Sequence, residues 1–332
     1  MPTGPASGGH FSVSNESSAS QQPSESRPNQ HAAPNPNSAP HPNAALQLQG
    51  LSKSYGGKVV VRDIHLTVPR GSFYGLVGPN GSGKTTTVLM ATGLLRPDAG
   101  TALVCGHNVW GSMAEANAAK GAYGLLADGL PVFDRLSGQE YLHYLGLLRG
   151  IDEPTVSQRS RELLDALDLA DSSSKLIVDY SAGMTKKILL AGALLHRPDI
   201  LILDEPFEAV DPVSATTIRE ILQAYVASSG TVIMSSHVME TVEALCDHVA
   251  VIGKNQVLAD GTLDEVRAGS SLSERFVELV GGRHLAEGSL EWLAGAGQGS
   301  ASADAADNNN AGDSNNAGDS NKAADSNKEA QQ

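Results

Sequence analysis

The sequence predicts an α/β fold in which a mixed β-sheet core carries an inserted α-helical subdomain. Two short apolar runs have the pattern of buried parallel strands, one beginning at Phe73 and one within Pro198 to Pro206. The first run leads through a glycine-rich turn into a helical pattern, and the second ends in two carboxylates. A long interval of mainly helical pattern separates them, which predicts the helical subdomain at about residues 110–185.

The foldable part of the 332-residue chain is its middle, because both ends are biased in composition. Residues 1–44 are rich in Ser, Pro, Asn, Gln and Gly, with no apolar segment behind a basic start, so we expect disorder there and no secretory signal. Residues 283–332 end in repeats of Ala, Asn, Asp and Ser, and we expect an acidic, low-complexity, disordered tail. Residues 45–282 then remain as the expected folded domain.

Charge, hydropathy and cysteine content argue against several classes of function. The formal net charge of -14 comes from 23 Lys and Arg against 37 Asp and Glu, which argues against nonspecific nucleic-acid binding, because that needs a basic stripe. The sequence contains no run of about 18 apolar residues and therefore predicts no transmembrane helix. The two cysteines, Cys105 and Cys246, stand far apart and are expected to be reduced thiols, with no CxxC motif for zinc or redox chemistry.

The glycine-rich turn after the first strand has the spacing of a phosphate-binding loop. The segment GPNGSGKTT begins at Gly78 and fits the pattern G-x-x-x-x-G-K-[ST]. Glycines let backbone N–H groups converge on phosphate oxygens, and the helix that follows adds the positive end of its dipole. Lys84 is expected to reach the β- and γ-phosphates as a catalytic cation, and the Thr85 hydroxyl to ligate Mg²⁺. The predicted ATP-binding residues of the loop are Gly78, Pro79, Asn80, Gly81, Ser82, Gly83, Lys84, Thr85 and Thr86.

This loop predicts a P-loop NTPase, and the alternative is a simple glycine-rich turn between a strand and a helix. The second strand supports the NTPase interpretation, because Asp204 at its end is expected to hold Mg²⁺ through a water molecule and Glu205 to accept a proton from the attacking water. Taken alone, this segment could also be a strand followed by an acidic turn that Pro206 stops.

A third motif, YSAGM at Tyr180 to Met184, begins a helix in which Ser181 can act as N-cap. Together with the two phosphate-site motifs and the long interval between them, it resembles the signature of ATP-binding cassette subunits of ABC transporters, over about residues 46–281. The resemblance implies that Ser181 and Gly183 bind the γ-phosphate of an ATP held by the opposite cassette. A plain serine-capped helix is the alternative, although lysines and no acid follow the cap, which leaves the terminus open to an anion.

Three further residues take expected roles from the same resemblance. Tyr55 matches the aromatic residue that stacks on adenine, with a simple strand residue as the alternative. Asp211, in the segment EAVDP, matches a position that contacts the facing subunit. His237 follows the strand pattern TVIMSS and matches the catalytic histidine that senses the γ-phosphate, with a structural or solvated histidine as the alternative. Parallel sheets bind ligands at that end of their strands, which favours the functional interpretation.

Two positions depart from the family pattern. Asp128 stands where the family has a glutamine that approaches Mg²⁺ and the attacking water, so it is either a metal ligand or a solvated loop residue. Ala182 replaces the first glycine of the signature. Because of these two departures, the resemblance alone does not predict that the chain hydrolyses ATP at the full rate of the family.

The resemblance as a whole implies an exporter-type ATPase subunit that uses ATP and Mg²⁺. Its expected partners are a transmembrane permease on a separate chain and a second copy of itself, or a homologous cassette, at the cytoplasmic face of the membrane. One alternative is a soluble cassette ATPase that acts on ribosomes or DNA, although the chain has a single phosphate loop and no sustained heptads. The other alternative is a regulator that binds ATP and hydrolyses it poorly.

Overall fold

A computed structural model describes residues 41–127, 129 and 132–281 of the chain. The expected tail at 283–332, Asp128 and most of the expected segment 1–44 lie outside the described residues. The first described residues form a turn in which the Ala44 amide donates a hydrogen bond to the His41 carbonyl, and strand β1 begins at Ala44. The Arg70 amide also donates a hydrogen bond to the Asn43 carbonyl of this turn.

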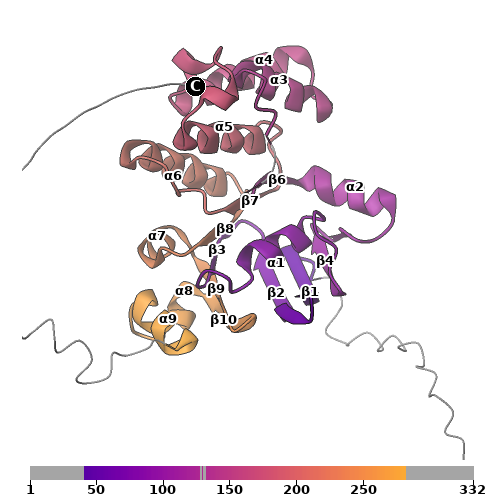
Figure 1. Ribbon diagram of the computed structural model, residues 1–332, viewed down its shortest axis with the longest axis vertical. Helices are drawn as coiled ribbons and strands as arrows, with labels where there is room; N and C mark the ends of the chain where they lie inside the picture. Colours follow the sequence, from indigo (N-terminus) through magenta and orange to yellow (C-terminus); the bar gives the residue numbers. More distant parts are fainter. Residues whose placement is uncertain (1–40, 128, 130–131, 282–332) are drawn as a thin grey trace, which may run out of the picture. The chain divides into compact units, whose positions relative to one another are not determined.

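Within the described residues, six strands form a mixed sheet in the order β10-β9-β3-β8-β7-β6 (Figure 1). Strand β3 pairs in parallel with β8 and β9, and β7 pairs in parallel with β8 and β6, whereas β10 is antiparallel to β9. The predicted mixed sheet is therefore confirmed. The strands are β3 (Phe73–Val77), β6 (Tyr123–Leu126), β7 (Ile200–Asp204), β8 (Thr231–Ser236), β9 (His248–Gly253) and β10 (Gln256–Thr262).

The central strands of this sheet are buried on both faces. Every residue of β3 and β7 is buried. In β3, Phe73 and Val77 belong to one core cluster and Tyr74 and Leu76 to the other, because successive side chains of a strand point to opposite faces. This explains why both strands appear in the sequence as continuous apolar runs.

A second sheet covers one of these faces. In the described part of the chain it has four antiparallel strands in the order β2-β1-β4-β5, and with helices α1 and α2 it encloses one core cluster. Its elements are β1 (Ala44–Tyr55), β2 (Lys58–Pro69), β4 (Ala99–Val104), β5 (His107–Asn108), α1 (Lys84–Ala91) and α2 (Met113–Ala122). The sequence predicted opening strands here but not a separate sheet.

The other face and one end of the six-stranded sheet carry the remaining helices, with α3, α4 and α5 gathered near β6 and β7 (Figure 1). Their bounds are α3 (Gly138–Leu148), α4 (Glu153–Ala166), α5 (Ala182–Leu194), α6 (Pro212–Ala227), α7 (Met239–Leu245), α8 (Leu263–Arg267) and α9 (Leu272–Val280), with short 3₁₀ turns η2 (Ala170–Ser172) and η3 (Ile177–Asp179). Among the described residues, none of the helices has both the length and the apolar character needed to cross a bilayer.

The predicted helical interval of 110–185 contains strand β6, which pairs with β7 in the main sheet. A Cβ at Gly124 would collide with the Ala193 carbonyl, so α5 packs on this strand at backbone distance. We therefore propose that the helical subdomain begins after β6, at α3. The strand follows α2 without a break, which is why its four residues read as part of a helical stretch.

The sheet brings three loops to one edge. Val77 at the end of β3 pairs with Ser236 at the end of β8, and Asp204 at the end of β7 pairs with Ser235. The segments that follow β3, β7 and β8 therefore start side by side, at the edge where parallel sheets bind their ligands.

Candidate nucleotide-binding site

The phosphate loop between β3 and α1 is fixed by close backbone packing. A Cβ at Gly78 would lie 2.5 Å from the Ile252 carbonyl oxygen of β9. A Cβ at Gly83 would lie 2.7 Å from the Val60 carbonyl oxygen of β2, and Gly83 also has a left-handed φ of 104°. Only glycine combines this conformation with this lack of space.

The start of helix α1 fits an anion. Gly83 is its N-cap and provides no side-chain hydrogen bond, and the first turn contains no acidic residue. The buried hydroxyl of Ser82 has no hydrogen-bond partner among the described residues. Unpaired N–H groups, a buried free hydroxyl and the positive end of a helix dipole together match the needs of a phosphate group.

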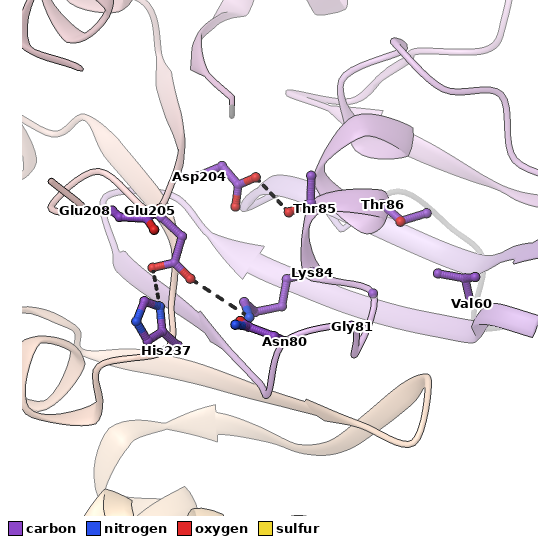
Figure 2. A pocket seen from close by; sticks show the side chains of 11 residues that line it. Val60, Asn80, Gly81, Lys84, Thr85, Thr86, Asp204, Glu205, Glu208 and His237 are labelled. Carbon is purple, nitrogen blue, oxygen red and sulfur yellow. Dashed lines mark hydrogen bonds and ion pairs between the residues drawn. The ribbon is translucent and has the colours of Figure 1, made fainter. Parts of the chain in front are cut away.

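A pocket of about 350 Å³ opens at this loop (Figure 2). It is lined by Val60, Asn80, Gly81, Gly83, Lys84, Thr85, Thr86, Asp204, Glu205, Glu208 and His237. The structure thus brings together most of the loop residues, both carboxylates and the histidine that the sequence singled out. Val60 and Glu208 are additions that sequence reasoning missed.

Lys84 is the buried cation of the pocket. Its Nζ donates a hydrogen bond to the Gly78 carbonyl at 2.7 Å and lies 4.0 Å from Glu205 Oε1. Burial lowers the pKa of Lys84, while the carboxylates of Glu205 and Asp204 act in the opposite direction. The side chain is therefore held along the loop, at the place where the charge of a phosphate chain would be neutralised.

Asp204 and Thr85 form a pair of oxygen ligands suited to Mg²⁺. Asp204 is 1% exposed, and its carboxylate accepts a hydrogen bond from the Thr85 hydroxyl at 2.9 Å and another from the Ser235 hydroxyl. A hydroxyl beside a carboxylate at the edge of a phosphate pocket is the oxygen-only donor set that Mg²⁺ prefers. Ser235 positions this carboxylate. The sequence did not predict this role, because it placed Ser235 only in a strand.

Glu205 points into the pocket from an unusual backbone conformation. Its φ of 46° is left-handed, which costs a non-glycine residue on the order of 1 kcal/mol. Its amide donates to Ser235 Oγ at 3.1 Å, and its Oε2 lies 3.0 Å from His237 Nδ1. Figure 2 shows the carboxylate between the histidine ring and Lys84. The strain thus accompanies a carboxylate aimed at the Lys84 ammonium.

Tyr55 lies outside this group of residues. It ends β1, its ring is 50% exposed, and Lys53 Nζ lies 5.7 Å from the ring centroid. The hairpin that it shares with β2 does reach the pocket through Val60. Adenine stacking on Tyr55 remains a proposal.

Ser181, Gly183 and Asp211 do not line the pocket of their own chain, as far as the described residues define it. Ser181 Oγ accepts a hydrogen bond from the Met184 amide at 3.2 Å, so it caps α5. Asp211 caps α6 by accepting hydrogen bonds from the Val213 and Ser214 amides, both at 3.0 Å. Hydrogen bonds from Ser214, and to a smaller extent the nearby Lys187, lower the pKa of Asp211. Ser181 and Asp211 are both exposed.

The chain is similar to known proteins in family, sequence and structure. The family model for ABC transporters matches residues 61–208. The chain is 36% identical, over 71% of its length and 70% of the relative's, to the daunorubicin/doxorubicin resistance ATP-binding protein DrrA of Streptomyces peucetius. It is 35% identical to the Nod factor export ATP-binding protein I of Ralstonia nicotianae, over 67% of this chain and 68% of that protein.

A solved structure of the ATP-binding subunit of an ABC transporter is similar at a TM-score of 0.66 and 28% identity, and covers 71% of this chain and 99% of its own. These comparisons confirm the family resemblance and the P-loop NTPase fold, and they give no support to a ribosomal or DNA-directed ATPase. The chain belongs to the ABC transporter family, as the ATP-binding and ATP-hydrolysing subunit of an exporter-type transporter whose permease is a separate protein.

Proposed function

We propose that the pocket around Lys84 is the site at which this subunit binds and hydrolyses ATP with Mg²⁺. The observation that carries the proposal is the position of the Glu205 carboxylate, between His237 Nδ1 at 3.0 Å and Lys84 Nζ at 4.0 Å. A carboxylate beside the cation that binds the terminal phosphate can take a proton from a water molecule that attacks this phosphate.

The residues around the loop bind and orient the triphosphate. The amides of the loop and the start of α1 hold the phosphate oxygens, and Lys84 neutralises their charge. Thr85 and Asp204 would hold Mg²⁺, which, when bound, supplies positive charge to the phosphoryl oxygens. Tyr55 would stack on the adenine ring, since it is exposed on the same hairpin as Val60. Asp128, the further ligand expected from the sequence, stays a prediction.

Glu205 and His237 are the groups proposed to act on the proton of the attacking water. The Glu205 side chain is 16% exposed, so the pocket keeps the carboxylate partly away from solvent. His237 Nδ1–H would donate a hydrogen bond to the ionised Glu205 carboxylate and so orient it. A hydrogen bond from Nε2 to the terminal phosphate requires a proton on that nitrogen as well, which is the imidazolium form of His237.

The test of this site is ATP turnover by purified variants. Glu205→Gln keeps the size of the side chain but removes its basicity, so we expect hydrolysis to fall by roughly 10²-fold or more while ATP affinity is retained. Lys84→Ala should lose turnover because the phosphate charge is no longer neutralised. Glu278→Gln, which changes an exposed acid on α9, is the matched control and should hydrolyse ATP normally. A folded Glu205→Gln protein with wild-type turnover would show that the proton acceptor is another group.

We also propose that two copies, or this chain and a homologous cassette, share their nucleotide sites. Ser181 and Asp211 are exposed at the first turns of two helices, and neither contacts the pocket of its own chain in the described residues. The start of α5 has no acidic residue in its first turn, so its dipole can bind a phosphate that another copy presents.

The proposed docking site of the permease is a groove of about 590 Å³ beside α3. Exposed apolar side chains gather here, since Tyr144, Leu147 and Leu176 line the groove and Phe133 packs edge-to-face on Tyr144 at 5.2 Å. An apolar groove with a polar rim suits a short helix from a membrane protein. Docking through this groove would place the subunit at the cytoplasmic face of the membrane. The full lining is Ser137, Gln139, Glu140, His143, Tyr144, Leu147, Ser174 and Leu176.

A further inference from the structure

Two consecutive lysines near the start of α5 are buried. Lys186 is 9% exposed and Lys187 is 6% exposed. Burying an ammonium group is costly unless hydrogen bonds compensate it, and a helix N-terminus adds an unfavourable dipole. The hydrogen bonds of the two ammonium groups therefore indicate which segments of the chain these lysines fix.

The Lys187 ammonium joins three segments of the chain. Its Nζ donates to Ser214 Oγ at 3.3 Å, in the first turn of α6, and to the Asp168 carbonyl at 3.4 Å, just after α4. Asp168 has a left-handed φ of 53°, so the chain turns sharply at this contact. One buried cation thus connects α5, the end of α4 and the start of α6.

A second contact lies one turn away on the same face of α5. Gly183 precedes Lys187 by four residues, which places both on one side of the helix. A Cβ at Gly183 would lie 2.9 Å from the Ala209 carbonyl oxygen, so the helix approaches the segment 209–214 at backbone distance there. The two contacts bracket Asp211, and Lys186 Nζ reaches the start of the same loop at the Asp204 carbonyl, 3.5 Å away.

We propose that Lys187 is a positioning residue that fixes the start of α6, with Asp211, against the first turn of α5, with Ser181 and Gly183. The start of α5 and Asp211 then face the partner copy as one unit: α5 binds the γ-phosphate that the partner presents, and Asp211 contacts the partner chain itself. This role rests on the shared nucleotide site proposed above. It also connects the two sites of a dimer, because the loop that α5 holds begins at the Asp204 and Glu205 of its own pocket.

A purely structural role for Lys187 predicts a different outcome. Methionine has nearly the same length and a good helix propensity, so Lys187→Met can fill the space and keep α5 folded. A structural lysine would then change only the thermal unfolding midpoint. A positioning lysine would weaken the association of two copies without changing how one copy binds ATP.

The experiment measures the dimer affinity in the Glu205→Gln background, which hydrolyses ATP too slowly to release the partner. Sedimentation or light scattering with ATP and Mg²⁺ gives the dimer dissociation constant. Titration with ATP at protein concentrations below this constant gives the ATP affinity of a single copy. We expect Lys187→Met to weaken the dimer roughly tenfold or more with unchanged ATP affinity. Lys187→Arg, which keeps a cation, should recover most of the loss.

Lys120→Met is the matched control, since Lys120 is an exposed lysine on helix α2, and it should leave the dimer unchanged. A folded Lys187→Met protein whose dimer constant stays within about twofold of the background would overturn the positioning role while leaving the shared site intact. Failure of the Glu205→Gln protein itself to dimerise would overturn the shared site, and the role of Lys187 with it.

Discussion

Gly83 has two separate reasons to lack a side chain. Its φ of 104° lies in the left-handed region, and its missing Cβ would press on the Val60 carbonyl at 2.7 Å. Gly57, in the β1–β2 turn, has a φ of 80° but nothing within 4 Å of a built Cβ. The two glycines therefore share the conformational cost of a substitution and differ in the steric one.

We expect Gly83→Ala to lower ATP affinity by roughly tenfold or more, about 1.4 kcal/mol, because the loop must move away from β2 and no longer aims its amides at one point. Gly57→Ala should lower the free energy of unfolding by roughly 1–2 kcal/mol, because alanine is strained at a left-handed φ, with little change in ATP affinity. Titration with a fluorescent ATP analogue, together with thermal unfolding, measures both effects. Equal ATP affinities of the two variants would show that the Val60 contact does not shape the loop.

Helix α5 shows what local pattern can predict at the scale of an element. The Ser181 cap was evident from the sequence and is present in the structure. The contacts of the lysines after it were not predictable in the same way, because they reach residues distant in the sequence, among them the Asp204 carbonyl, 18 residues from Lys186, and Ser214, 27 residues from Lys187. Local pattern also failed at β6, where four strand residues follow α2 directly and only the pairing with β7 identifies them.

Helix α3 leads to a prediction about the permease. Leu147 lines the proposed docking groove and is 48% exposed, so Leu147→Glu should cost little stability but should place a charge where the permease would pack. We expect the variant to lose co-purification with the permease and transport, while ATP hydrolysis by the isolated subunit continues.

Val277→Glu is the control for this prediction, since Val277 is 46% exposed on α9 and does not line the groove. Normal co-purification of the Leu147→Glu protein would move the docking site elsewhere on the subunit.

At the scale of the whole molecule, the site joins segments that lie far apart in the sequence, yet much of it was predictable. Its residues belong to short motifs, and the edge formed by the ends of β3, β7 and β8 follows from parallel pairing. Val60 was not predictable, because its place in the pocket depends on how the antiparallel sheet packs against the phosphate loop. Glu208 follows Glu205 by three residues, but nothing local indicates that the turn brings it to the pocket.

One copy of the chain cannot form the complete proposed site, because part of that site comes from a second copy. Ser181 and Asp211 are exposed caps on neighbouring helices, and their proposed phosphate and partner contacts require a facing molecule. If the proposal is right, nucleotide should control the association of two copies, since each bound ATP would contact both chains.

The most direct test is the mass of the Glu205→Gln protein, measured by light scattering at tens of micromolar with and without ATP and Mg²⁺. We predict a dimer with ATP and Mg²⁺, a monomer without them, and loss of the dimer when Ser181→Arg is added, because a bulky side chain fills the space in front of the α5 terminus. Ser181→Ala removes the cap and the hydroxyl proposed to contact the phosphate but leaves the space open, so it should weaken the ATP-dependent dimer less than Ser181→Arg does. An ATP-bound Glu205→Gln protein that stays monomeric, or a dimer that persists with Ser181→Arg, would contradict a nucleotide site shared between two chains.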